Sequence, residues 1–150
     1  MNRHEDVLQQ VARIARSGRD FFVAMYPNVV DAEVRMTFAY IAEVKNRLLT
    51  DLTPWLTAGV DLAKEDPADH ISPAAIMAKT YADTRKAFSG GNPAAGAAAL
   101  SFGEEQLTRL LERAFEQSSS PPLKQVLKSY HPQLVICREA MRRLRARQAA

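Results

Sequence analysis

The chain has 150 residues, of which 47% are hydrophobic and 25% are charged, and its formal net charge is +3. This length and hydrophobic fraction suit one domain with its own core, so we predict a single domain over residues 1–150. The small excess of positive charge does not by itself indicate a nucleic-acid partner. The single cysteine, Cys137, excludes an internal disulfide and suits a reducing compartment. We expect it to be buried and unreactive.

The beginning of the sequence is charged and passes directly into an amphipathic pattern, so we expect no signal peptide. No apolar run approaches the roughly 18 residues that a bilayer span requires. We therefore expect a cytoplasmic protein without membrane association.

Apolar residues recur every three or four positions over residues 7–25, which predicts a first long helix. Gly18 falls on its apolar side, where we expect the close approach of a neighbouring helix. Asp31 is a good N-cap for a second helix, which we expect to end near Pro54. Because few residues separate the two helices, they should form an antiparallel hairpin.

A long connection from Ala58 to Asn92 follows this hairpin. Its first part is polar and runs through Pro67, which argues against a continuous helix. Ser72-Pro73 then predicts the start of a new helix, with the serine as cap and the proline at the first helical position. Gly90-Gly91 predicts the end of this short helix.

Two more long helices are predicted after the connection. Asn92-Pro93 repeats the arrangement of cap and proline, and the apolar pattern continues to Gln117. Residues 118–122 form a polar turn, and a last helix carries apolar residues on one side up to Leu144. Pro132 lies inside that helix, where we expect a kink. We expect the tail over residues 145–148 to fray.

Hairpin, long crossover and hairpin together make the second and third long helices parallel, which is the ferritin-like arrangement of a four-helix bundle. The expected fold class is therefore all-α. It is a ferritin-like four-helix bundle of two antiparallel hairpins, with a short extra helix in the long crossover.

Four segments of the sequence carry a resemblance: Lys86–Asn92, Ser101–Glu105, Ser120–Leu123 and Arg138–Leu144. Together they resemble a bacterial ferritin-like family of unknown function. The resemblance implies a four-helix bundle and often dimerisation, so we expect a homodimer. It implies no agreed activity.

The metal ligands of ferritin-like proteins are not matched. Di-iron members place one Glu on each of two helices and a Glu-x-x-His pair on each of the other two. This sequence has no Glu-x-x-His, and its histidines are His4, His70 and His131. Arg138 stands where some members of the family have a histidine, and a cation there repels a metal. We therefore expect no metal and no other cofactor.

Some ionisable residues are nevertheless expected to face the core: Lys45, Glu104, Arg138 and His131. Because a buried charge is costly unless it is paired, we expect Glu104 to pair with Lys45 or Arg138. The alternative is that these long side chains reach the edge of the bundle and stay hydrated.

Positive charge is concentrated near the end of the chain, at Arg138, Arg142, Arg143, Arg145 and Arg147. Such a basic patch can bind nucleic acid or an acidic partner through its cations. The alternative is that cations at a helix C-terminus complement the helix dipole. No row of aromatic residues is interleaved with these arginines for stacking on bases, so nucleic acid is not the expected partner.

No catalytic motif is present, and the sequence favours a role other than catalysis. We expect a non-catalytic ferritin-like bundle, an interaction or stress-related protein with a degenerate metal site. Two alternatives stay open. One is a metal-binding or oxidising ferritin-like protein, and the other is a protein that binds nucleic acid or an acidic partner through its basic C-terminal helix.

Overall fold

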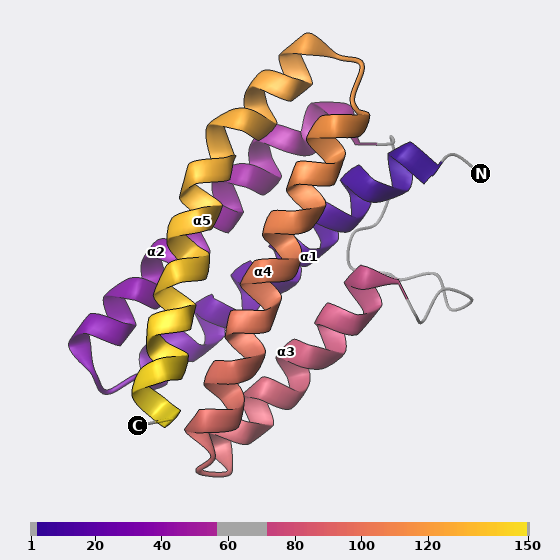
Figure 1. Ribbon diagram of the computed structural model, residues 1–150. Helices are drawn as coiled ribbons and strands as arrows, with labels where there is room; N and C mark the ends of the chain where they lie inside the picture. The colour runs from indigo at the N-terminus through magenta and orange to yellow at the C-terminus, as the bar shows by residue number, and fades with distance from the viewer. Residues whose placement is uncertain (1–2, 57–71, 150) are drawn as a thin grey trace.

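The computed structural model describes residues 3–56 and 72–149, and this part of the chain contains helices and no strand. The predicted all-α class is confirmed. The elements are α1 (Arg3–Met25), η1 (Tyr26–Asn28), α2 (Ala32–Leu52), η2 (Thr53–Trp55), α3 (Pro73–Ser89), α4 (Pro93–Gln117) and α5 (Pro121–Ala149) (Figure 1). The predicted polar segment through Pro67, and His70, lie outside the described residues.

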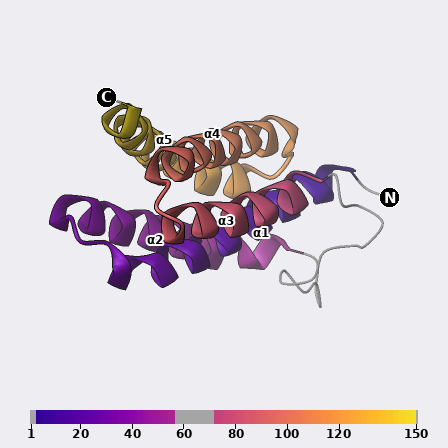
Figure 2. The same cartoon turned by 90° about the horizontal axis from the view of Figure 1, so that it is seen from below.

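The helices pack as two hairpins, α1 with α2 and α4 with α5, and the two hairpins lie in two layers (Figure 2). Helix α3 belongs to the crossover and packs against α1 and α4. In Figure 1, α2 and α4 run toward the same end of the molecule. This order and direction place α1, α2, α4 and α5 around a common interior.

Polar side chains fix the starts of the helices. The Asp31 carboxylate accepts a hydrogen bond from the backbone N–H of Val34 at 3.1 Å and so caps α2, as predicted. The Ser72 hydroxyl likewise accepts from the N–H of Ala75 at 3.1 Å. Gln10 of α1 accepts from the N–H of Ala74 at 2.7 Å, which ties the start of the crossover helix to the first hairpin.

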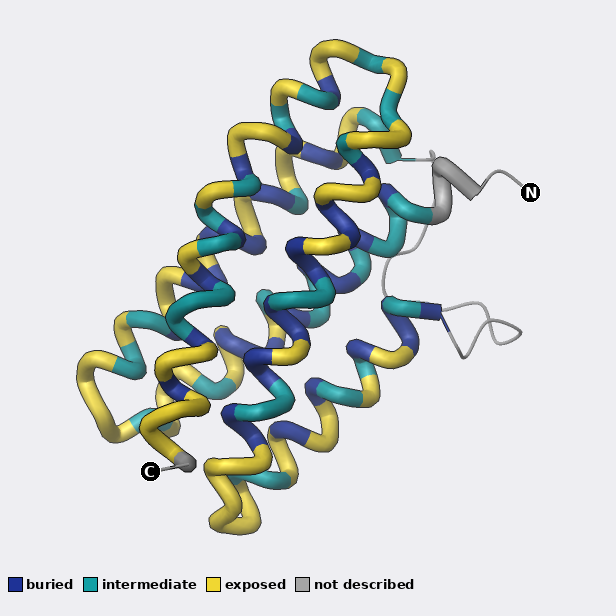
Figure 3. Tube along the Cα trace, in the orientation of Figure 1, coloured by how far each residue is buried: buried dark blue, intermediate teal, exposed yellow. Residues whose placement is uncertain are grey.

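The core follows the inward sides of the helices, where buried positions face one another (Figure 3). Phe22 of α1 packs edge-on against Phe38 of α2, with ring centroids 4.9 Å apart. Phe21 stacks on Tyr81 of α3 at 5.3 Å. Aromatic contacts of this geometry add to the stability that burial provides, so they join both helices to α1.

The last helix differs from expectation at its end. Helix α5 continues across Pro132 and remains helical to Ala149, so the predicted fraying of residues 145–148 is wrong. Arg147 Nη2 lies 3.5 Å from the Asp31 carboxylate, and this contact joins the end of α5 to the start of α2. None of the helices in the described ranges has the length and apolar character needed to cross a membrane.

Candidate functional site: a buried ion pair

Lys45 of α2 and Glu104 of α4 meet inside the bundle. The Lys45 ammonium donates to both carboxylate oxygens of Glu104, at 2.6 Å and 2.8 Å. The two side chains are only 0% and 2% exposed. Glu104 is the only acidic residue among those with described burial that is buried. One lysine therefore occupies both oxygens of the carboxylate.

Glycines make room for this pair. A Cβ atom added at Gly18 of α1 would lie 2.7 Å from Lys45 Cε and 2.8 Å from the Tyr81 hydroxyl, closer than real Cβ atoms come. The predicted close approach at Gly18 is confirmed, and the approaching groups are side chains from α2 and α3. On α4, a Cβ at Gly103 would lie 2.6 Å from Met77 Cε. The lysine of the pair is thus enclosed without spare volume on the side of α1, and Gly103 gives the same close fit to Met77 of α3.

The groups around the pair are apolar or held neutral. The Phe22 ring centroid lies 5.8 Å from Lys45 Nζ. Burial raises the pKa of the Tyr81 hydroxyl well above its usual range, and the charge of Glu104 adds to the rise. Burial also raises the pKa of the Cys137 thiol to about 12, with Glu104 adding to this effect and Lys45 opposing it. Cys137 is buried, as predicted, and its thiol is protonated at neutral pH.

The Tyr81 hydroxyl is unusual because it is buried and makes no hydrogen bond with any described residue. An unpaired buried hydroxyl costs roughly 1–3 kcal/mol. Its position beside Gly18 shows that packing, rather than hydrogen bonding, places the tyrosine there.

The donor groups at this centre do not fit a di-iron site. Two metal ions need several carboxylates and imidazoles, whereas the centre offers one carboxylate already held by an ammonium, with one phenol and one thiol nearby. Within the described ranges, no group of three or more His, Cys, Asp or Glu side chains is placed to hold a metal ion.

Two predicted members of the core charge network lie elsewhere. Arg138 Nε is 3.4 Å from Glu139 and its side chain is 23% exposed. His131 Nε2 is 2.7 Å from Glu112, and its side chain is 40% exposed. The prediction that Arg138 and His131 face the core is therefore wrong. Each has a carboxylate beside it at the surface, where both partners keep water, so neither needs Glu104.

The predicted basic patch is partly neutralised. Besides the contact between Arg138 and Glu139, Arg142 lies 2.8 Å from Glu139 and 3.5 Å from Glu105. Arg147 contacts Asp31, as described above. Only Arg143 and Arg145 of the patch have no acidic partner among the described residues. The field of the patch is therefore weaker than the count of arginines implies.

Comparisons of the chain with models of protein families, with curated proteins and with solved structures gave no match in any of the three. The structure itself defines the class: an all-α helical bundle organised around a closed lysine–glutamate pair.

Proposed function

We propose that this protein is a non-catalytic ferritin-like bundle, in which an ion pair stands at the position of a metal centre, and that it acts as an interaction protein. The observation that carries the proposal is the contact of Lys45 Nζ with both oxygens of Glu104 in the bundle interior. A carboxylate held in this way is not available to a metal or to a substrate. The neighbouring phenol and thiol are neutral, so they supply neither a base nor a nucleophile at neutral pH.

The order of the elements supports the ferritin-like part of the proposal. Two hairpins are joined by a long crossover that contains α3, and α2 and α4 run in the same direction (Figure 1). One long crossover in a four-helix bundle is the feature that separates the ferritin-like arrangement from a simple up-down-up-down bundle.

Metal analysis of the purified full chain tests the central part of the proposal. After incubation with Fe(II), Mn(II) or Zn(II) and removal of free ions by gel filtration, we expect far less than one ion per chain. Stoichiometric retention of any of these ions by wild type that is lost in the Glu104→Gln variant would refute it. The Glu104→Gln variant is the matched control, because an ion held at the centre would be lost with the carboxylate, whereas ions held at the surface would remain.

Exposed apolar residues support the interaction role. Met36 and Tyr40 lie one turn apart on α2 and are 73% and 40% exposed. Ile136, at 52% exposed, lies on α5, which packs against α2. Large apolar side chains that remain in water often mark a surface covered by a partner. A second copy of the chain is the simplest partner, and the interface we propose includes these two helices.

Sedimentation equilibrium tests the dimer. We expect the wild-type chain to dimerise and the Met36→Glu variant to be monomeric, because a charge on this surface would be buried at the interface. Val30→Glu is the matched control, since Val30 is 93% exposed in the turn before α2. It should dimerise like wild type. A monomeric wild-type protein would refute the dimer.

A further inference from the structure

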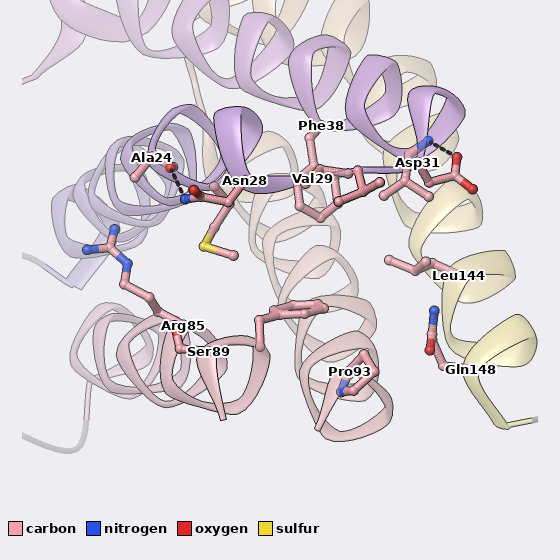
Figure 4. Close-up of a pocket in the computed structure, with 14 residues that line it drawn as sticks. Ala24, Asn28, Val29, Asp31, Phe38, Arg85, Ser89, Pro93, Leu144 and Gln148 are labelled. Carbon is pink, nitrogen blue, oxygen red and sulfur yellow. Dashed lines mark hydrogen bonds between the residues drawn. The ribbon is translucent and has the colours of Figure 1, made fainter. Parts of the chain in front are cut away.

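A pocket of about 710 Å³ lies at the end of the bundle where the turn between α1 and α2, the turn between α3 and α4, and the last turns of α5 meet. Figure 4 shows Val29 and Phe38 on one side of the pocket, Pro93 on the opposite side, and Leu144 on α5. Most of the lining is apolar: Ala24, Met25, Val29, Val30, Val34, Phe38, Phe88, Pro93 and Leu144. Its volume falls in the range of small-molecule sites, roughly 300–1,000 Å³.

Among the described residues, the pocket is lined by two charged side chains, Asp31 and Arg85, and only one of them is free to pair with a ligand. Asp31 accepts the N–H of Val34 at 3.1 Å and contacts Arg147 at 3.5 Å. The hydrogen bond from Val34 is the main cause that lowers the pKa of Asp31, so this carboxylate stays ionised and engaged. Arg85, by contrast, makes no hydrogen bond or ion pair with any described residue. The pocket therefore presents one free cation.

The free cation and the apolar surface lie at different places in the pocket. In Figure 4 the Arg85 side chain extends from α3 toward α1, at the end of the pocket where Ala24 and Asn28 lie, whereas Leu144 and Gln148 of α5 lie at the other end. A ligand that satisfies both must carry an anionic group at one end and an apolar body that extends toward α5. A cationic ligand does not fit, because Arg85 would repel it. A ligand with several phosphates does not fit either, because the pocket offers one guanidinium beside an apolar surface.

We propose that this pocket binds a medium-chain fatty carboxylate. The Arg85 guanidinium pairs with the carboxylate through charge-assisted hydrogen bonds, for which its planar donors are well suited. The alkyl chain lies between Phe38 and Pro93 and extends toward Leu144, where burial removes its apolar surface from water. This site is separate from the pair of Lys45 and Glu104, and it does not depend on the function proposed above.

Isothermal titration calorimetry of the full chain with decanoate, below its micelle concentration, tests the proposal, with 1-decanol as the neutral analogue. We expect one decanoate per chain, and weaker binding of decanol. The Arg85→Gln variant should bind decanoate roughly tenfold more weakly or worse, because a charge-assisted bidentate contact is lost, and it should bind decanol as wild type does.

Two further variants show whether decanoate binds in this pocket or is merely attracted by the positive charge of the protein surface. Arg113→Gln is the matched control, because Arg113 is exposed on α4, about 30 Å along the helix from Pro93. It should bind decanoate like wild type. Val29→Trp should fill the pocket and abolish binding of both compounds, with its fold checked by circular dichroism. No binding of decanoate to wild type, or equal binding to wild type and Arg85→Gln, would overturn the proposal.

Discussion

Two lysine–carboxylate pairs of this protein have similar nitrogen–oxygen distances and different surroundings. Lys45 Nζ lies 2.6 Å from Glu104 in the interior, and Lys79 Nζ lies 2.8 Å from Asp83 on the outer side of α3. The side chains of the first pair are 0% and 2% exposed, whereas those of the second are 79% and 56% exposed. Distance alone therefore does not decide what an ion pair contributes. The two pairs differ in whether water can solvate the remaining charge after one partner is removed.

Removing one partner of the buried pair should have the largest effect. We expect Lys45→Met to lower the free energy of unfolding by about 3–5 kcal/mol, because Glu104 is left as an uncompensated buried charge. Urea denaturation followed by circular dichroism measures this change.

The exposed pair supplies the control. Lys79→Met makes the same substitution on α3, where water solvates Asp83 after the lysine is gone, so we expect no measurable loss of stability. Similar losses for the Lys45 and Lys79 variants would break the comparison, because burial would then have no influence on the pair.

A smaller effect is expected from Gly18→Ala, which tests how tightly the buried lysine is enclosed. Helix propensity alone predicts a gain of roughly 0.5–1 kcal/mol. The added Cβ, however, would lie 2.7 Å from Lys45 Cε and 2.8 Å from the Tyr81 hydroxyl, and overpacking costs about 1–3 kcal/mol. We expect net destabilisation in urea, and a variant more stable than wild type would show that the enclosure is loose.

Tyr130 and Asp51 form a contact of intermediate burial, between α5 and α2. Burial and this hydrogen bond raise the pKa of Tyr130 from 10.0 to about 12. The unfolded state therefore loses the proton first, and the stabilisation is complete below pH 10 and is lost as the pH rises toward 12.

Tyr130→Phe should cost about 1 kcal/mol at neutral pH through loss of the hydrogen bond, less than the loss of the buried lysine. Absorbance titration should show that the variant lacks a tyrosine ionising near pH 12. If wild-type Tyr130 ionises at its ordinary pKa, the contact with Asp51 does not form in solution.

Most of the fold follows from local signals in the sequence. Asp31, Ser72 and Asn92 each cap a helix through a side-chain oxygen, and each precedes an apolar pattern of helical period. The end of α5 was not predictable in this way. Arg147 contacts Asp31 across 116 positions of sequence, and no local pattern reveals such a contact.

The site was only partly predictable. Lys45 stood out because it is a charge in the middle of an apolar helix side, and Glu104 because it borders one. Helical phase does not determine which nearby carboxylate a cation contacts, so the sequence predicts Arg138 and His131 on the inward side, although the structure pairs them with Glu139 and Glu112 at the surface. Tyr81 was missed. Its spacing of four residues from Met77 on α3 is the signal that places it on the inward side.

The pocket near Arg85 was not predictable from the sequence either. It arises because two connections between helices and the last turns of α5 lie at the same end of the bundle, and its lining comes from all five helices and the turn between the first two. A surface assembled from such distant segments has no linear pattern.

The double replacement of Lys45 and Glu104 by methionine tests the central claim most directly. If the two residues matter because each compensates the charge of the other, the double variant should unfold within about 1 kcal/mol of wild type, or be more stable, although Lys45→Met alone loses several kcal/mol. A double variant that loses the sum of the two single losses would contradict the account, because the residues would then act independently.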